Sequence, residues 1–298
     1  MVHAEVDARN QPQYAATDVV DVTHGWYFYG ITERGSLAPS LLASFGASKN
    51  DRPSVLGDES PLQLVELFGL AAVVRRVLLD DFRPTAFRDR LHNDNGLEAL
   101  VRCHNDVVEA IHARQPILPS KLGVVYANAD DILCALRPAH DALLRRLHRL
   151  QGCDEWAIHL YADEERIRGR VADAEPAVNK LRNELALARP GRAYFLEQQL
   201  RDELRAATEQ ALLTHAERTF DRLSSFSVDA LASPTKPRTD ATEHLEILRA
   251  SFLVPRDIIQ QFETEVQLCC DDSEGLRCEY TGPWPAYSFA AQEDGETV

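Results

Sequence analysis

The C-terminal part of the chain constrains the fold most, because it contains two segments that read as strands of one sheet. Arg249–Val254 has the sequence RASFLV, and its last three apolar residues predict a strand buried on both faces. Further on, Leu276, Cys278 and Tyr280 alternate with polar residues, with the period of two of a strand that has one buried face. Gly282 and the two prolines after it are expected to end this strand. The chain therefore closes on a sheet that earlier segments must complete.

The N-terminal half predicts a unit of mixed strands and helices. Gly25–Thr32 is an aromatic-rich strand in which Gly30 marks a bulge or a close approach of another backbone. Leu62–Leu79 contains two apolar runs divided by Gly69, which predicts neighbouring strands, with a buried helix as the alternative. After Asn95, apolar residues recur at intervals of three and four and predict an amphipathic helix.

The middle of the chain predicts a strand followed by a long, kinked helix. Pro116–Asn128 indicates a turn and then a strand with alternate apolar side chains on one face. Asn128 is a helix-cap candidate, because its side chain can accept a hydrogen bond from a free backbone N–H of the first turn. Pro138 is expected to kink the helix and Gly152 to end it.

A helical insertion is predicted over residues 163–224. Apolar residues recur there at alternating steps of four and three, and Pro176 is expected to break or restart the first helix. Arg189–Gly191 indicates a turn, after which a second apolar stripe runs back, so the two arms predict an antiparallel hairpin. This hairpin is either a solvated structural arm or a handle for another protein. Ser224–Thr242 is expected to be a flexible return loop.

Composition and motifs exclude several classes of function. The chain has 298 residues, enough for two domains, and its formal charge of −15 disfavours nucleic acid and anionic membranes as partners. No apolar run approaches the roughly 20 residues that span a bilayer, and the first residues lack a secretory signal, so we expect a cytosolic protein. The sequence contains no phosphate-binding loop, nucleophile elbow or zinc-protease motif, so we expect no catalytic residues.

Histidine and cysteine give no sign of a metal or cofactor site. His104 lies on the apolar stripe of the helix after Asn95, where a lone histidine is more often a hydrogen-bonded core residue than a ligand. The six cysteines form no CxxC pair and have no histidine at a metal-site interval, so we interpret them as small apolar residues.

The order of several segments resembles the gas vesicle protein F/L family. The segment TGPWPAYSF near the C-terminus, after a SFLVPRD junction, carries the resemblance most clearly, and YFYGIT, RCHNDVVEAI, EWAIHLY and PGRAYFLEQQL precede it in order. The resemblance implies an α+β fold of two modified ferredoxin-like domains, the second with the inserted helical hairpin. It implies an accessory role in building gas vesicles, in contact with the major shell protein and other vesicle proteins, without catalysis or cofactors. The alternative is a ferredoxin-like enzyme or sensor that binds a small molecule.

The pattern and the resemblance together divide the chain into successive parts. The expected parts are a disordered tail (1–17), an N-terminal α+β domain (18–127), a connecting helix (128–152), a C-terminal α+β domain (153–290) with its helical insertion (163–224), and an acidic tail (291–298).

Aromatic and apolar residues of the C-terminal segment and of the hairpin are the candidate partner contacts. They are Trp284, Tyr287, Phe289, Tyr194 and Leu200. In the alternative interpretation, the aromatic residues of the C-terminal segment pack over their own domain.

Overall fold

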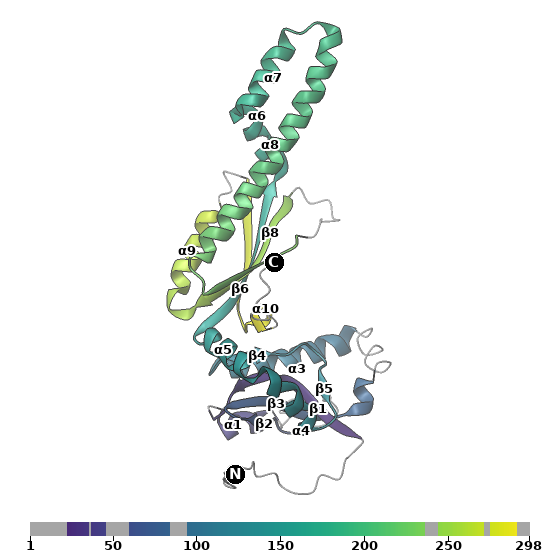
Figure 1. The fold of residues 1–298 in the computed structure, drawn as a ribbon, viewed down its shortest axis with the longest axis vertical. Coiled ribbons are helices and arrows are strands. Elements are labelled where there is room, and N and C mark those ends of the chain that lie inside the picture. Colours follow the sequence, from purple (N-terminus) through teal and green to yellow (C-terminus); the bar gives the residue numbers. More distant parts are fainter. Residues whose placement is uncertain are drawn as a thin grey trace, which may run out of the picture.

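The computed structural model describes residues 23–35, 37–45, 60–83, 94–235, 244–270 and 275–290. The tails predicted for residues 1–17 and 291–298 lie outside this part of the chain. Figure 1 shows an elongated molecule with one sheet at its lower end, a second sheet in the middle and a helical hairpin at its upper end.

The first sheet is antiparallel, and its central strand is the one predicted near the N-terminus. Its order is β2-β3-β1-β4, and β5 also pairs with β1. The strands are β1 (His24–Glu33), β2 (Gln63–Leu67), β3 (Leu70–Leu78), β4 (Ile117–Pro119) and β5 (Val125–Tyr126). The two-strand interpretation of the segment around Gly69 is therefore correct, and the buried-helix alternative is wrong.

The predicted irregularity at Gly30 is present. The pairing of β1 with β3 shifts register between Phe28 and Gly30. A Cβ atom on Gly30 would lie 2.4 Å from the backbone oxygen of Leu118, and the residue has φ +155°. Only glycine lets β4 approach this closely.

Helices cover both faces of the first sheet. They are α1 (Pro39–Ser44), α3 (Asp94–His112), α4 (Ala129–Leu136) and α5 (His140–Leu150), with short 3-10 turns η1 (Leu79–Phe82) and η2 (Arg137–Ala139). Leu100 and Ile111 of α3 pack with Tyr27 of β1 on one face, whereas Ile132 and Leu147 pack on the other. Asn128 caps α4 as predicted, accepting a 2.9 Å hydrogen bond from the backbone N–H of Asp131.

The second sheet is antiparallel in the order β7-β8-β6-β9. Its strands are β6 (Cys153–Asp163), β7 (Asp229–Ser233), β8 (His244–Pro255) and β9 (Leu276–Trp284). As predicted, β8 lies inside the sheet, and its residues Phe252 to Val254 are fully buried. Helices α8 (Pro190–Ser224) and α9 (Ile259–Cys269) cover one face of this sheet. The apolar core between the sheet and these helices includes Trp156 and Phe262. The remaining elements of the described residues in this half are the 3-10 turn η3 (Arg256–Ile258), between β8 and α9, and helix α10 (Tyr287–Ala290) after β9.

The predicted hairpin is present. One arm consists of α6 (Glu164–Ala174) and α7 (Pro176–Ala186), with the restart at Pro176, and α8 returns as the second arm. The turn ends before Pro190, which is the first residue of α8, because proline fits the first helical position, where no N–H donor is needed. With 35 residues, α8 is roughly 50 Å long, and its far end protrudes well beyond the sheet (Figure 1).

Three details differ from the sequence-based expectation. The expected loop Ser224–Thr242 contains β7, which pairs with β8 despite its weak strand propensity. Strand β9 does not end at Gly282 but continues to Trp284, because β9 is an edge strand, where proline need not donate to a ladder. The expected strand after Pro116 is divided into β4 and β5 by the positive-φ turn at Gly123.

The cysteine interpretation is wrong for one pair. Cys270 at the end of α9 and Cys278 in β9 form a disulfide, with their Cα atoms 5.4 Å apart. The spacing of the two residues matches no sequence motif, so the pair is recognised only once helix α9 and strand β9 are placed side by side.

A polar cluster joins the two halves of the molecule, and in it His112 is buried, Asp154 half-buried and Arg256 exposed. The Nε2 atom of His112, at the end of α3, lies 2.7 Å from Oδ1 of Asp154 in β6. Arg256 donates to the same oxygen at 2.8 Å and to the backbone oxygen of His112 at 3.2 Å. Burial alone would raise the pKa of Asp154, but the hydrogen bonds from His112 and Arg256 leave it lowered.

The predicted core role of His104 is confirmed. Its ring is 2% exposed, and Nδ1 lies 3.0 Å from the hydroxyl of Tyr27. Burial lowers the pKa of His104 to about 4.

We therefore expect stability to decrease between pH 7 and pH 5. The unfolded chain binds the histidine proton first, so stability that is present above the ordinary pKa of 6.5 is lost as the pH falls toward 4. This pKa difference corresponds to a loss of roughly 2 kcal/mol at pH 5. Urea unfolding at both pH values should show this loss in the wild type and not in His104→Leu. The same pH dependence in both proteins would contradict the assignment.

Candidate partner-binding surfaces

The C-terminal segment, residues 282–290, contains three of the predicted contact residues and lies between the two sheets (Figure 1). Phe289 is 5% exposed and belongs to the apolar cluster that includes residues of both sheets. The hydroxyl of Tyr287 donates to Oδ1 of Asn105 at 2.9 Å, and burial raises its pKa. Trp284 is 42% exposed. Of the three residues, Trp284 is thus the one that is most accessible to a partner.

Glu155 holds this segment in place from the second sheet. It is a buried residue of β6, and its carboxylate accepts a 2.8 Å hydrogen bond from the backbone N–H of Ser288 and a 2.5 Å bond from the hydroxyl of the same residue. A buried carboxylate needs such donors to offset its lost hydration. The segment therefore contacts both sheets, and does not pack over its own domain alone.

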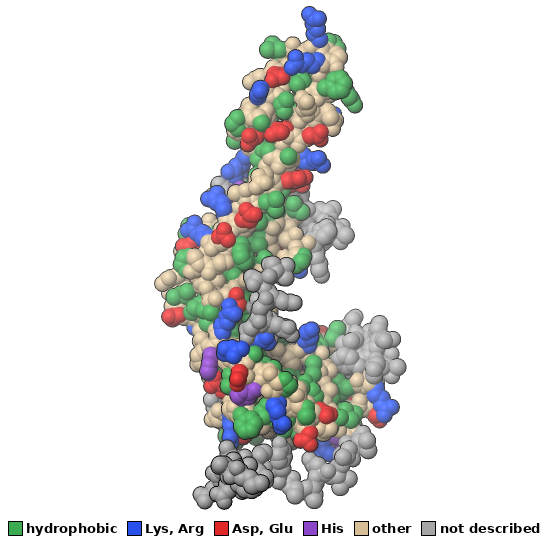
Figure 2. Space-filling view, viewed as in Figure 1, with side chains coloured by type: hydrophobic (Ala, Val, Ile, Leu, Met, Phe, Trp, Pro, Cys, Tyr) green, Lys and Arg blue, Asp and Glu red, His purple; other side chains and the backbone are tan. Residues whose placement is uncertain are grey.

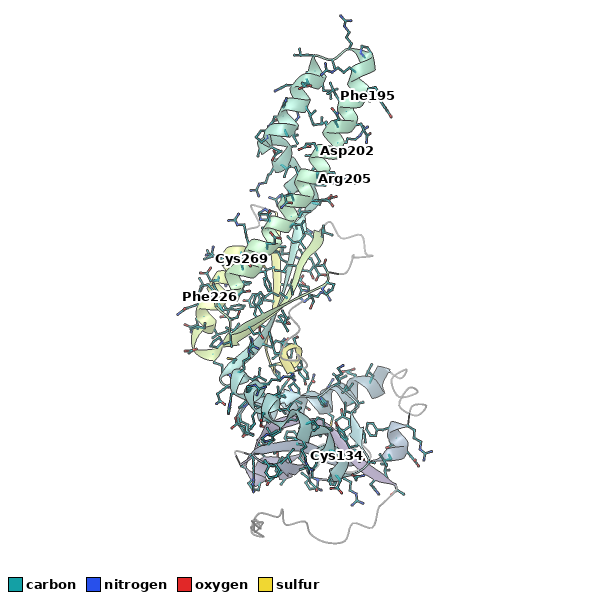
Figure 3. All side chains as sticks on the ribbon, viewed as in Figure 1. Cys134, Phe195, Asp202, Arg205, Phe226 and Cys269 are labelled. Carbon is teal, nitrogen blue, oxygen red and sulfur yellow. A yellow bond between two sulfur atoms is a disulfide. The ribbon has the colours of Figure 1, made fainter. Side chains whose placement is uncertain are left out.

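The far end of the hairpin carries an exposed apolar group. Leu187, Tyr194 and Phe195 are 89%, 65% and 67% exposed, and the Tyr194 and Phe195 rings contact edge to face at 5.9 Å. Figure 3 shows Phe195 pointing away from the molecule at this end. Leu200 is half-buried, one turn further along α8. The structure thus brings Tyr194 close to the end of the hairpin and leaves it far from the C-terminal segment.

Basic side chains surround this apolar group, although the whole chain is acidic. Arg182, Arg189 and Arg192 lie in this part of the hairpin, where Arg192 pairs with Glu184 at 3.2 Å. Figure 2 shows Lys and Arg side chains at the extreme end and acidic side chains along the middle of the hairpin. A partner that touches this end meets apolar and positively charged groups together.

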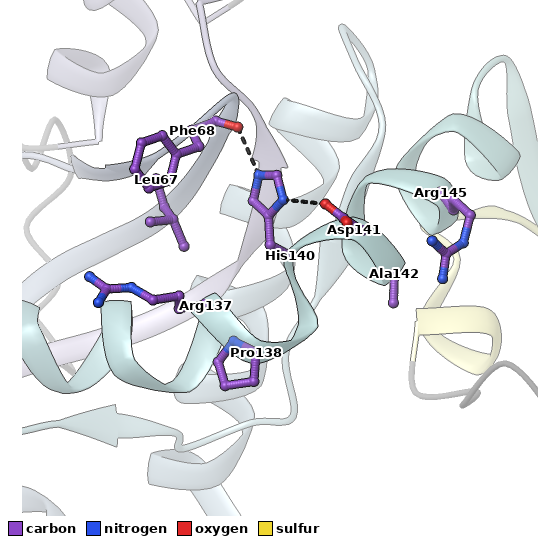
Figure 4. A pocket seen from close by; sticks show the side chains of 8 residues that line it. All are labelled: Leu67, Phe68, Arg137, Pro138, His140, Asp141, Ala142 and Arg145. Carbon is purple, nitrogen blue, oxygen red and sulfur yellow. Dashed lines mark hydrogen bonds and ion pairs between the residues drawn. The ribbon is translucent and has the colours of Figure 1, made fainter. Parts of the chain in front are cut away.

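A third surface was not found from the sequence. It is an open hollow of about 560 Å³ beside the turn between β2 and β3 (Figure 4). Its lining consists of Leu67, Phe68, Arg137, Pro138, His140, Asp141, Ala142 and Arg145. We call it the Phe68 hollow. The available sequence signal was an aromatic residue directly before Gly69, at a position where a tight turn favours Asn or Asp.

His140 connects the turn to helix α5 at the edge of this hollow. Its Nε2 atom donates to the backbone oxygen of Phe68 at 2.8 Å, and Nδ1 lies 2.7 Å from Oδ1 of Asp141 (Figure 4). Both ring nitrogens face acceptors, so the protonated ring satisfies both contacts. The bond to the Phe68 oxygen and then the bond to Asp141 raise the pKa of His140.

The described part of the chain contains no group of three or more His, Cys, Asp or Glu residues placed to hold a metal ion. Within the same residues, no helix combines the length and the apolar character needed to cross a membrane.

Comparison with known proteins decides the family. The model of the family described as gas vesicle synthesis protein GvpL/GvpF matches residues 25–291. The chain belongs to this family. Its role is therefore in gas vesicle formation, together with other gas vesicle proteins.

Curated relatives include both branches of the GvpL/GvpF family. Gas vesicle protein L of Streptomyces sp. (strain CB03234) is 30% identical over 80% of this chain and 87% of its own length. Gas vesicle protein F of the same organism is 26% identical over 88% of this chain and 98% of its own length. Gas vesicle protein L1 of Halobacterium salinarum is 22% identical over 94% of this chain and 95% of its own length.

Solved structures of the family share the fold. The crystal structure of GvpF from Microcystis aeruginosa aligns with a TM-score of 0.58 over 90% of this chain and 99% of that chain, at 18% identity. The crystal structure of GvpF from Anabaena sp. PCC7120 aligns with a TM-score of 0.60 over 91% of this chain and 98% of that chain, at 17% identity. At this identity the likeness supports the mixed helix and antiparallel sheet architecture alone.

The two aromatic ends of the C-terminal segment are expected to respond differently to truncation. Phe289→Ala removes a buried ring and should lower the free energy of unfolding by about 3–5 kcal/mol. Trp284→Ala removes a half-exposed ring and should cost less than about 1 kcal/mol. Urea denaturation of the two variants measures both values. Equal losses would show that the segment is not packed as described.

Proposed function

We propose that this member of the GvpL/GvpF family is an accessory protein of gas vesicle assembly that binds the major shell protein and other vesicle proteins, in a chaperone-like way or as a minor structural component. The observation that carries the proposal is the family match, which extends over nearly the whole chain. The exposed apolar end of the hairpin supplies the surface. The protein acts in the cytoplasm and at the growing vesicle, without catalysis.

The physical argument concerns the shell protein before assembly. A subunit that forms the wall of a gas-filled compartment exposes apolar surface and unpaired strand edges until its neighbours cover them. A partner that shields this surface needs apolar contacts on a body that remains in solution. The net charge of −15 favours solubility, and Tyr194, Leu200 and Trp284 supply accessible or half-buried apolar contacts.

In this proposal the body consists of two modified ferredoxin-like units with different tasks. The units are residues 18–127 and 153–290, connected by residues 128–152. In this proposal the first unit anchors the C-terminal segment, and the second presents the insertion 163–224. From Ala211 onward, α8 packs on the second sheet, so the hairpin end lies roughly 30 Å from the body, and the body need not contact the growing shell.

Co-expression with the major shell protein tests the proposal. A pull-down should capture the shell protein, and light scattering should show reduced aggregation. The double variant Tyr194→Ser with Phe195→Ser should reduce capture by about tenfold or more, since truncating aromatic anchors removes most binding energy at such interfaces.

A matched control lies on the same helix. Leu213 is 58% exposed on α8, away from the hairpin end, and Leu213→Ser should leave capture unchanged. Absent capture with unchanged scattering would contradict binding of the shell protein and would favour a scaffold acting on other accessory proteins.

A further inference from the structure

The Phe68 hollow contains a residue that folding alone does not explain. Phe68 and Gly69 are the two central residues of the turn between β2 and β3, and both have positive φ, 38° and 93°. Such primed turns favour Asn or Asp followed by Gly, because a bulky side chain is strained at positive φ. Phe68 is also 73% exposed. A strained backbone and an exposed aromatic ring are both unfavourable for stability.

The packing around Phe68 contributes little stability to offset this strain and exposure. Its ring contacts His140 edge to face, with the ring centres 6.4 Å apart. The hydrogen bond from His140 reaches the backbone oxygen of Phe68, which any residue would supply. Strained, exposed residues that the surroundings hold in place occur mainly at functional sites. The observation therefore favours recognition over folding as the role of the Phe68 side chain.

The charges of the hollow indicate what it recognises. Arg137 lines it from η2, and Asp141 is the single carboxylate among the lining residues. The side chain of Arg137 is exposed and forms no ion pair within the described residues. Because the chain as a whole has a charge of −15, a cationic hollow stands out against its surroundings. Nearby cations favour carboxylates, whereas the net charge repels long polyanions.

We propose that the Phe68 hollow binds a short protein segment in which carboxylate side chains flank a large apolar side chain. Phe68 contacts the apolar side chain, and Arg137 pairs with a flanking carboxylate. His140 fixes the turn against α5, so that the aromatic ring is already in position before binding. The volume of about 560 Å³ lies within the range of about 300–1,000 Å³ that is usual for ligand sites.

This inference does not depend on the proposed function. The hollow lies beside the first sheet, whereas the proposed shell-protein contacts lie on the hairpin (Figure 1) and at Trp284 at the end of β9. One surface can fail its test while the other passes.

The first experiment is a selection from a random 12-residue peptide library displayed on phage, with the full-length chain as target. Arg137→Glu protein serves for counter-selection. We expect enriched peptides to combine Asp or Glu with Phe, Leu, Ile or Trp. Absent enrichment, or enrichment of basic peptides, would overturn the proposal.

The second experiment measures synthetic copies of the enriched peptides by fluorescence anisotropy. Phe68→Asn and Arg137→Glu should each weaken binding by about tenfold or more, and replacing the peptide carboxylates by amides should do the same. Phe195→Asn changes an equally exposed aromatic residue on the hairpin and should leave binding unchanged.

Thermal unfolding distinguishes a binding role from a structural one. Phe68→Asn places a favoured residue at the positive-φ position and should raise the melting temperature by about 2 °C while it weakens peptide binding. A lower melting temperature with unchanged binding would show that Phe68 is a structural residue. Analytical sedimentation tests whether the chain associates with itself. Self-association that Arg137→Glu abolishes would assign the hollow to a second copy of the chain and overturn the proposal.

Discussion

The fold depends on one apolar cluster in which the end of the chain packs against the first sheet. Phe28 and Leu118 enter it from the first sheet, Leu147 from α5, and Leu253 and Phe289 from the C-terminal half. Residues more than 250 positions apart are thereby buried together, and full burial of one aromatic side chain contributes about 1.5–3 kcal/mol. Because this cluster spans both sheets, loss of the C-terminal contacts would loosen the whole body.

Polar contacts fix the geometry that this cluster leaves open. Apolar packing is not directional, whereas the cluster of His112, Asp154 and Arg256 and the bonds from Ser288 to Glu155 act only at defined distances and angles. These contacts hold α3 against the start of β6. The hairpin extends from the other end of β6, so its direction is set by the same strand. The surfaces proposed for partners lie outside this fixed body, where binding does not require the core to open.

Much of the fold could be predicted from local pattern. The run of apolar residues in β8, the Gly69 division and the restart at Pro176 each depend on steric or periodic rules within one segment. Long-range pairing could not be predicted from the sequence. Strand β7 forms because β8 offers an edge, and Cys270 meets Cys278 because α9 lies beside β9. The candidate surfaces also depend on long-range contacts. Packing against the first sheet covers Phe289, and the proposed binding role of Phe68 depends on its backbone conformation and on His140.

Amide hydrogen exchange at Ser288 tests the central claim most directly, namely that the C-terminal segment is part of the core. Its N–H donates to a buried carboxylate, and the adjacent Phe289 is buried. The account predicts that this amide opens with a free energy close to that of the slowest amides in β1 and β8. Exchange near the rate of an unprotected amide would show that the segment is loosely attached, and would contradict the account.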